Sequence, residues 1–391
     1  MWTAQALSGA GNQVGRVAIA VLAYDRTRSP LLTGLAYALT YLPAIFGGPL
    51  LSVLADIFPR RAVMLCCDLV SAALVAAMAI PHVPYWVLCV LLVGTVLLSA
   101  PFSAARIALM PEILPGDALP LGQGAVNIAF QVNQVGGFAV GGALVAALGT
   151  GRTLVADAAT FIVSACIVAA RVQRRPAPAR ESGSSRSLLR GVREGWTLVF
   201  GNRIARSMTF FGWLAAFYVL PEGIAVPYAH ALGGGPPAAG LLMAAMPVGT
   251  VLGATALARL CPPARQNSAM GWLATLSCAP LIVCACRPAL PVVLLLWMIS
   301  GVGSVYQMPA VARFIRAVPA SGRASAFGIA QSGLLAAQGV GILAGGAAAQ
   351  AFGPTATVAV SGLAGLAVAI VLAISVRGLR ADPRAATAIP A

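Results

Sequence analysis

Two copies of one glycine-rich pattern, Gln134-Val-Gly-Gly-Phe-Ala-Val-Gly-Gly-Ala-Leu-Val-Ala-Ala-Leu-Gly149 and Gln338-Gly-Val-Gly-Ile-Leu-Ala-Gly-Gly-Ala-Ala-Ala-Gln-Ala-Phe-Gly353, lie 204 residues apart in this chain of 391 residues. Seven of the sixteen positions are identical, and four of these seven are glycines. At the same offset, Pro59 and Arg61 match Pro263 and Arg265. Because the offset is about half of the chain, the sequence predicts two equivalent halves, as in alternating-access transporters.

The composition indicates a membrane protein. Hydrophobic residues make up 59% of the chain and charged residues 9%, whereas a soluble domain has about 45–50% and about 25%. This argues against a soluble enzyme, a disordered chain and a secreted disulfide scaffold. A membrane-spanning helix needs about 20 mostly apolar residues, and the apolar runs predict twelve, at 2–24, 31–55, 62–81, 84–110, 121–148, 151–171, 206–229, 237–259, 267–287, 290–314, 322–350 and 353–376.

The predicted fold class is therefore an all-α membrane protein, with twelve transmembrane helices in two pseudo-symmetric six-helix halves. We expect an N-terminal bundle at 1–171, a cytoplasmic linker at 172–205, a C-terminal bundle at 206–376 and a cytoplasmic tail at 377–391. Within the linker, residues 187–200 have the pattern of an amphipathic interfacial helix. The eight Cys fall mostly in apolar runs and are expected to pack as small apolar residues.

The positive charge has a consistent distribution along the chain. All 25 basic residues are arginine, against 10 acids, which gives a formal net charge of +15. With the N-terminus in the cytoplasm, 20 arginines fall on the cytoplasmic side and four on the other, and Arg16 alone lies deep inside a predicted span, away from its ends. This split follows the positive-inside rule. It places both termini in the cytoplasm and explains the charge without a nucleic-acid partner.

One polar stripe runs along the first predicted helix. It consists of Gln5, Ser8, Asn12 and Arg16, whose spacing places them on one face. Because polar groups in a bilayer must face protein or water, we predict that the stripe lines a central cavity; interhelical hydrogen bonding alone is the alternative. Polar residues in other predicted helices are weaker candidates for lining the same cavity: Ser99, Ser103, Asn127, Gln131, Tyr218, Ser304 and Gln307.

Arg16 is expected to need an acidic partner, because an unpaired intramembrane charge is costly. At the helical rise, Arg16 and Glu222 lie about 21 Å and about 22 Å from the starts of the first and seventh predicted helices. We therefore predict that the two side chains approach each other and form an extracytoplasmic gate. Asp157 is a further candidate for gating or proton coupling, with a capping acid as the alternative reading.

A second charged group lies near the cytoplasmic side. Asp68 lies about 9 Å into the segment 62–81 by the same rise. A carboxylate at this depth needs a partner, and Arg60, Arg61 and Arg106 are the candidates. We expect these residues to form a conformational latch rather than a transport site.

The segment Ser52-Val-Leu-Ala-Asp-Ile-Phe-Pro-Arg-Arg61 resembles the loop 2–3 signature of the major facilitator superfamily, G-x-x-x-D-(R/K)-x-G-R-(R/K). Asp56, Arg60 and Arg61 match, whereas Ser52, Ile57 and Pro59 depart from the signature. The resemblance implies a latch role for Asp56. Its carboxylate would cap the helix that begins near residue 323, where the helix dipole favours an anion.

Other stretches extend the resemblance over nearly the whole chain. Gly137-Phe-Ala-Val-Gly-Gly142 resembles the antiporter-associated signature G-P-x-x-G-G, with Phe138 in place of Pro. Its glycines, and their equivalents in the second copy, are expected to allow close helix packing: Gly137, Gly141, Gly142, Gly341, Gly345 and Gly346. Asp157-Ala-Ala-Thr-Phe161 and Pro221-Glu-Gly-Ile-Ala-Val-Pro-Tyr228 are similar to the branch with macrolide-efflux permeases and a siderophore exporter.

The sequence thus predicts a secondary active transporter of the plasma membrane that exports a hydrophobic or amphipathic small molecule, with proton antiport as the expected coupling. The alternatives are uptake of a small metabolite and a non-transporting membrane scaffold or sensor. An enzyme is not expected, because the chain has only two His and no nucleophile–base cluster. We expect a monomer in the lipid bilayer, with a small-molecule substrate and protons as partners, and neither a cofactor nor a metal ion.

Overall fold

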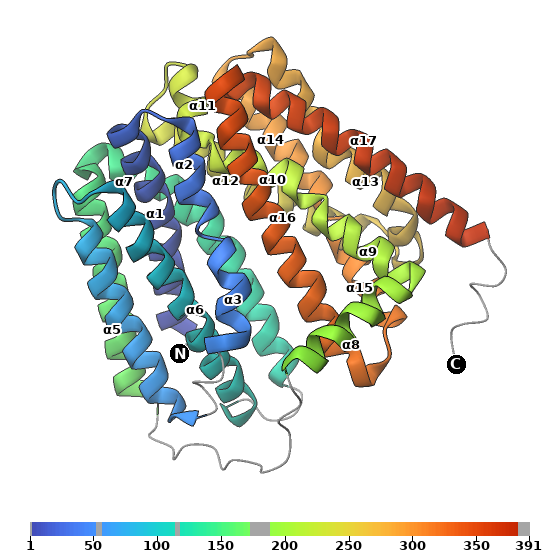
Figure 1. The fold of residues 1–391 in the computed structure, drawn as a ribbon, viewed down its shortest axis with the longest axis horizontal. Helices are drawn as coiled ribbons and strands as arrows, with labels where there is room; N and C mark the ends of the chain where they lie inside the picture. Colours follow the sequence, from blue (N-terminus) through green and yellow to red (C-terminus); the bar gives the residue numbers. More distant parts are fainter. Residues whose placement is uncertain (1, 52–56, 114–117, 173–187, 382–391) are drawn as a thin grey trace. The chain divides into compact units, whose positions relative to one another are not determined.

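The computed structural model describes residues 2–51, 57–113, 118–172 and 188–381, and this part of the chain contains helices and no strand (Figure 1). Nine helices among the described residues are long and apolar enough to cross a membrane. The three other predicted spans correspond to α1 (Trp2–Thr27), to α2 (Pro30–Ala38) with α3 (Leu42–Leu51), and to one half of α7 (Ala118–Arg171). The predicted fold class of twelve transmembrane helices is confirmed.

The remaining helices follow the predicted order. The first half of the chain also has α5 (Arg60–Met78) and α6 (Tyr85–Ile113). After α8 (Leu188–Gly201), the second half contains α9 (Arg203–Trp213), α10 (Ala215–Gly223), α11 (Ala225–Ala231), α12 (Pro236–Leu260), α13 (Pro263–Ile282), η1 (Val283–Cys286), α14 (Leu290–Ser304), α15 (Gln307–Ala317), η2 (Ala320–Gly322), α16 (Arg323–Phe352) and α17 (Pro354–Ala381).

Three predicted spans are broken rather than continuous. The span 31–55 is interrupted between α2 and α3, the span 206–229 consists of α9, α10 and α11, and the span 290–314 consists of α14 and α15. Pro43 and Pro309 lie within the first three residues of the helix that follows a break, where a missing N–H costs little. The apolar pattern of the sequence continues through each of these breaks, so the sequence did not reveal where the three helices are interrupted.

The repeated pattern has the same backbone geometry in both copies. Gly149 and Gly353 adopt φ angles of 80° and 85° with ψ angles of 165° and 154°, a conformation that residues with a side chain rarely adopt. One turn later, the hydroxyls of Thr153 and Thr357 donate to the carbonyls of these two glycines at 2.8 and 2.9 Å. The matching glycines therefore turn the chain from one membrane helix into the next.

The other repeated glycines allow close helix packing. A Cβ at Gly137 would lie 2.6 Å from the Cβ of Gln13 on α1, and one at Gly141 would lie 3.0 Å from the Cα of Val14. In the second copy, a Cβ at Gly341 would lie 2.9 Å from the carbonyl oxygen of Ala216 on α10. Gly345 faces Leu220 of α10, and Gly346 is buried. The first copy thus packs on α1, and the second packs on the element 204 residues further along the chain.

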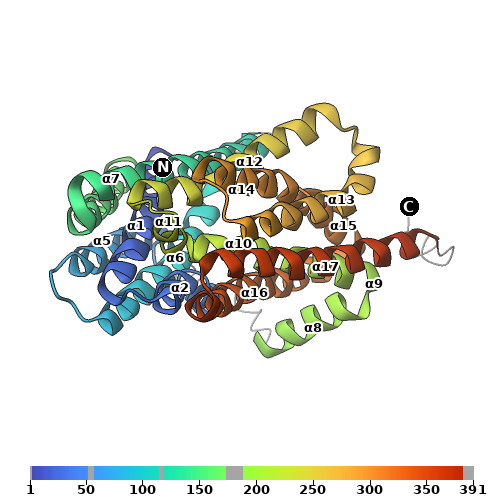
Figure 2. The same ribbon diagram turned by 90° about the horizontal axis from the view of Figure 1, so that it is seen from above.

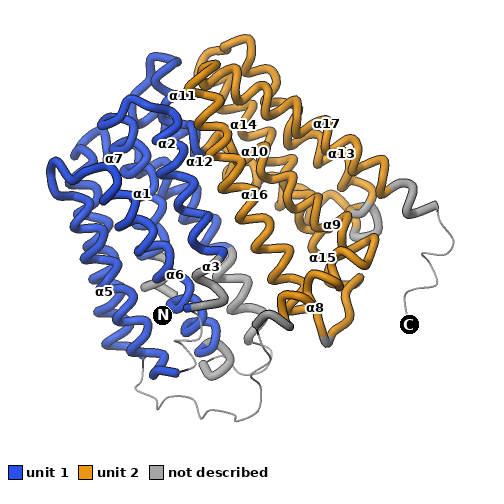
Figure 3. The backbone as a smooth tube through the Cα atoms, viewed as in Figure 1, with its two compact units in different colours: residues 1–182, 223–244 blue, residues 183–222, 245–391 orange. Residues whose placement is uncertain are grey.

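The described chain divides into two compact units (Figure 3). Unit 1 comprises Met1–Ser182 and Gly223–Ala244, and unit 2 comprises Gly183–Glu222 and Ala245–Ala391. Within unit 1, α7 and α12 approach at two glycines, since a Cβ at Gly142 would lie 2.9 Å from the Cα of Gly240. The halves predicted at 1–171 and 206–376 follow the sequence repeat and stay a prediction.

The helix predicted at 187–200 is present as α8, which lies along α16 in Figure 2. The two helices meet through a glycine face, since a Cβ at Gly195 would lie 2.7 Å from the carbonyl oxygen of Ser325 and the Ser325 hydroxyl donates to the Gly191 carbonyl. Val192 and Trp196 are exposed on the same helix. In α8, one face is therefore used for packing, and apolar side chains remain available to an interface.

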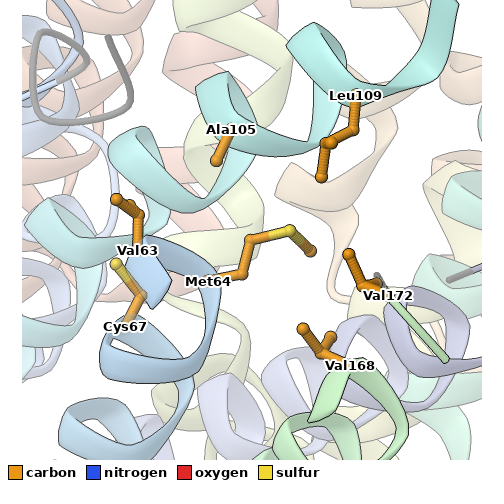
Figure 4. Close-up of a cluster of buried hydrophobic side chains, with 7 residues drawn as sticks. All are labelled: Val63, Met64, Cys67, Ala105, Leu109, Val168 and Val172. Atoms are coloured by element: carbon orange, nitrogen blue, oxygen red, sulfur yellow. The ribbon is translucent and has the colours of Figure 1, made fainter. Parts of the chain in front are cut away.

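Unit 1 has a buried apolar cluster near the start of α5 (Figure 4). It consists of seven side chains from α5, α6 and the end of α7: Val63, Met64, Cys67, Ala105, Leu109, Val168 and Val172. Cys67 is one of these apolar packing residues, and all eight Cys of the chain are free. The cluster fixes the depth at which Asp68, the next residue of α5, enters the bundle.

We expect Gly137→Ala to lower the stability of unit 1 by about 1–3 kcal/mol, because its Cβ would collide with Gln13 and the α1 backbone. Gly136→Ala is the matched control on the same helix, since a Cβ there meets no atom within 4 Å. Alanine at an open helical position is neutral or stabilises by up to about 1 kcal/mol. Thermal unfolding of both variants in detergent tests this difference, and equal midpoints would contradict the packing role of Gly137.

Candidate functional site

The predicted polar stripe lies on α1, with different exposure at each position. Ser8 is buried, Asn12 is exposed and Arg16 is half-buried, whereas the side chain of Gln5 lies outside the described residues. The guanidinium carbon of Arg16 lies 5.7 Å from the centre of the Tyr41 ring. This distance is within cation–π range. The ring of Tyr41 therefore stabilises a charge for which the sequence predicted only an acidic partner.

Tyr41 lies where the second span is interrupted. Between α2 and α3, the N–H groups of Thr40 and Tyr41 donate to the carbonyls of Tyr37 and Ala38 at 3.0 Å, three residues back rather than four. The rings of Tyr37 and Tyr41 lie 6.0 Å apart. Interrupted transmembrane helices are typical of transporter binding sites, because their free backbone groups can contact a substrate or ion. In unit 1, the break and the intramembrane arginine are brought together.

Asp157 is the single acidic residue of α7, with 3% of its surface exposed. Its carboxylate occupies a notch in α1 that two glycines leave open. A Cβ at Gly11 would lie 2.5 Å from Asp157 Oδ1, and a Cβ at Gly15 would collide with Oδ2. Oδ1 is buried and has no hydrogen-bond partner among the described residues. The structure therefore places a carboxylate directly against the helix that carries the polar stripe.

The predicted latch residues make several described contacts. Asp68 has 2% of its surface exposed, and its Oδ2 accepts a hydrogen bond from the Ser164 hydroxyl at 2.7 Å. Arg60 donates to the carbonyl of Ala108 at 3.0 Å. Arg61 donates to the carbonyl of Ala169, and Arg106 is half-buried on α6. Asp56 lies outside the described residues. These contacts connect α5 to α6 and α7, and the latch role stays a prediction.

Unit 2 contains a buried pair of tyrosines, Tyr218 and Tyr306, between two interrupted helices. The break at Leu214 separates α9 from α10, so the Phe211 carbonyl is not used as it would be in a continuous helix. The hydroxyl of Tyr306, which lies at the break between α14 and α15, donates to this carbonyl at 2.8 Å. Sequence reasoning missed Tyr306, although its position directly before the polar candidate Gln307 was a usable signal.

One tyrosine of this pair, Tyr218, is a predicted site residue, and two further predicted site residues lie close to it in the fold or along the helix. The side-chain amide of Gln307 donates to the Tyr218 hydroxyl, and the Tyr306 and Tyr218 hydroxyl oxygens lie 3.4 Å apart. Glu222 lies one turn after Tyr218 on α10, with 4% of its surface exposed. Arg16 belongs to unit 1 and Glu222 to unit 2, so the predicted gate stays a prediction. Unit 2 therefore combines an acid, an amide and two phenols within one polar group.

The remaining cavity candidates are more peripheral. Ser304 is buried, and its hydroxyl lies 2.9 Å from that of Thr250, so it connects α14 to α12. Ser99 is exposed and donates to the carbonyl of Val96 in its own helix. Ser103 and Gln131 are half-buried. Asn127 lies on α7, and its side chain is outside the described residues. Of these residues, only Ser304 has a described contact with another helix.

Comparison with known proteins identifies similar transporters. The family profile described as Major Facilitator Superfamily matches residues 1–224. The chain is 28% identical over 229 residues to YkuC, an uncharacterized MFS-type transporter of Bacillus subtilis, in a match that covers 54% of this chain and 52% of YkuC. It is 26% identical over 311 residues to the multidrug efflux pump Tap of Mycobacterium tuberculosis, which covers 75% of this chain and 73% of Tap.

Solved structures show the same fold at low sequence identity. A POT family transporter in complex with 5-aminolevulinic acid has a TM-score of 0.75 at 12% identity, with 95% of this chain and 94% of that chain covered. The nucleoside transporter NupG has a TM-score of 0.73 at 12% identity, with 96% and 98% covered. At such identities the likeness shows the architecture and not the substrate.

We expect Tyr306→Phe to destabilise unit 2 by about 1–3 kcal/mol, because the Phe211 carbonyl at the helix break would lose its donor in a buried position. Tyr24→Phe is the matched control, because the described contacts of Tyr24 with His230 and Arg28 use only its ring. Thermal unfolding in detergent measures both variants. Equal unfolding midpoints for wild type and Tyr306→Phe would contradict this role of the hydroxyl.

Proposed function

The chain belongs to the major facilitator superfamily and is a multi-pass membrane transporter, and on this basis we propose that it exports a hydrophobic or amphipathic small molecule in exchange for protons. The observation that carries the proposal is the pair of acids, Asp157 and Glu222, which are almost fully buried in membrane helices. Intramembrane acids are costly and typically mark ion pathways or proton relays.

The chemistry of the candidate residues in each unit supports an amphipathic substrate. In unit 2, two phenols and one amide from Tyr218, Tyr306 and Gln307 supply hydrogen-bonding groups, and in unit 1 Tyr41 supplies an aromatic face. The helices around them are rich in Ala, Leu, Phe and Met. Such a set suits a largely apolar molecule with a few polar groups. A sugar phosphate or an inorganic anion would require more positive charge than Arg16 supplies.

Export fits the relatives better than uptake. The printed name of Tap describes a multidrug efflux pump, and this chain matches three quarters of its own length to that protein. The arginine distribution favours a plasma-membrane orientation with both termini in the cytoplasm. In that orientation, the helical rise counted along the sequence predicts similar depths for Arg16 and Glu222, near the extracytoplasmic side. Their attraction would close that side, and proton or substrate binding would weaken it.

The proposal is tested by a susceptibility panel of amphipathic drugs in cells with and without the protein. We expect the protein to raise resistance to some of the drugs, and a proton ionophore to abolish the effect because export would lose its driving force. Unchanged sensitivity over the whole panel would favour a dedicated metabolite as substrate. A complete absence of gradient-linked flux would favour a scaffold.

Glu222→Gln is expected to abolish gradient-driven export, because it removes the charge that Arg16 would attract and with it the proposed gate. Glu194→Gln is the matched control, since Glu194 is exposed on α8 and has no part in the proposed gate. Efflux of a drug from the panel, normalised to the amount of protein in the membrane, measures both variants. Full efflux by Glu222→Gln would contradict the gate.

A further inference from the structure

At the contact between Asp157 and α1, two glycines of α1 leave the space that the carboxylate of Asp157 occupies. Gly11 and Gly15 lie one turn apart on the same face of α1 and are both buried. Cβ atoms at these positions would collide with the two carboxylate oxygens of Asp157, and a Cβ at Gly11 would also collide with the Thr160 hydroxyl. Any side chain at position 11 or 15 would therefore displace this carboxylate.

The repeat provides an internal comparison for this position. At the offset of 204 residues, Ser361 is the equivalent of Asp157, and its hydroxyl donates to the Phe217 carbonyl of α10 at 2.5 Å. This carbonyl is free because Pro221, four residues later, has no N–H to offer it. The second half thus has a permanent hydrogen bond at this position.

In the first half, α1 has no proline that frees a backbone carbonyl, as Pro221 does for Ser361 in the second half. The equivalent of Pro221 on α1 is Val17, which keeps its N–H, so α1 has no carbonyl freed by a proline at this level. An ionised Asp157 could not use such a carbonyl, because a carboxylate only accepts hydrogen bonds. Its Oδ1 has no hydrogen-bond donor among the described residues, although the residue is 3% exposed. A buried oxygen without a partner is costly unless something binds it. A proton satisfies it and neutralises the carboxylate.

The charged groups on the helices that pack against α7 make no described contact with Asp157. Arg16 on α1 lies over Tyr41, and Arg61 on α5 donates to the Ala169 carbonyl. Asp68 on α5 accepts a hydrogen bond from the Ser164 hydroxyl, and Arg106 lies near the C-terminal end of α6. Among the described residues, no ion pair joins any of these groups to Asp157. Its carboxylate is therefore not locked in a fixed structural pair.

From this arrangement we propose that Asp157 is the proton-binding site of the transporter, and that proton binding and release change how α1 rests on α7. Asn12 and Arg16 directly follow Gly11 and Gly15 in sequence, about 100° further round the same helix. A shift of α1 at the notch therefore moves the polar stripe. The carboxylate takes its proton from water on one side of the membrane and returns it to water on the other, and no bond in the substrate changes.

The inference rests on the proposed proton antiport and specifies where the proton is held. It differs from the predicted gate, because the site lies between two helices of unit 1 and requires no contact with Glu222. Glu222 would then respond to substrate and to Arg16, whereas Asp157 would carry the coupling proton.

Infrared difference spectroscopy tests the site without a transported substrate. The full chain in lipid is titrated from alkaline to acidic pH, and the C=O stretching band of newly protonated carboxyl groups is recorded. We expect one component of this band to be present in wild type and absent in Asp157→Asn. Asp68→Asn is the matched control, because Asp68 has a fixed partner in Ser164, and it should retain that component. An unchanged spectrum for Asp157→Asn would overturn the assignment.

Transport in proteoliposomes tests the coupling, with ethidium as the amphipathic probe. We expect Asp157→Asn to lose accumulation driven by a pH gradient by at least about fivefold, a typical size for coupling between sites, while it continues to exchange ethidium without a gradient. A wild-type protein without gradient-driven accumulation would overturn the proposed antiport. A driven wild type with an equally driven Asp157→Asn would overturn only the role of Asp157.

The glycine notch provides an independent variant in case Asp157→Asn folds poorly. Gly15→Ala keeps the carboxyl group but places a methyl group against its Oδ2, so we expect the same loss of pH-driven accumulation. Gly136→Ala, which adds a methyl group in open space, is the control. Wild-type coupling in Gly15→Ala would overturn the proposed role of the notch.

Discussion

Within a bilayer, a backbone N–H or C=O group that leaves its helical partner has no water to replace it. This constraint accounts for several of the polar contacts in the structure. Where α9 ends, the Tyr306 hydroxyl donates to the Phe211 carbonyl, and where Pro221 removes an N–H, the Ser361 hydroxyl donates to the Phe217 carbonyl. At the glycine turns, Thr153 and Thr357 supply hydroxyl donors. At these four positions, a polar side chain satisfies a backbone carbonyl.

The same constraint explains why polar side chains and helix breaks occur together in this chain. A break is tolerated only where a donor or acceptor is close, so side chains that stabilise a break are also positioned to contact a substrate. Tyr306 is the clearest case, since its hydroxyl bonds the backbone of α9 and lies 3.4 Å from that of Tyr218. The structural role of the tyrosine pair therefore coincides with its proposed functional role, and a variant there is best interpreted with a stability control.

The sequence alone predicted the architecture more readily than the contacts of the site. Twelve apolar runs and a repeat at 204 residues are long-range patterns, and single breaks do not disturb them. The notch at Gly11 and Gly15 was missed because it depends on which face of α1 meets α7, and a list of glycines does not contain that information. The contact between Arg16 and Tyr41 was not predicted, because an intramembrane arginine is expected to pair with an acid. An aromatic ring also stabilises a cation.

The two halves share a backbone plan and differ in chemistry at equivalent positions. Asp157 corresponds to Ser361, and Asp68 corresponds to Trp272, which is exposed. Both acids thus occur only in the first half, on α5 and α7, while the second half has fixed hydroxyl bonds or an apolar surface. A serine bond to a carbonyl is independent of pH, whereas a carboxyl group changes its charge with its proton. In the proposal, the carboxyl of Asp157 responds to protons where it lies against α1, and Ser361 provides a version of the same contact that is independent of pH.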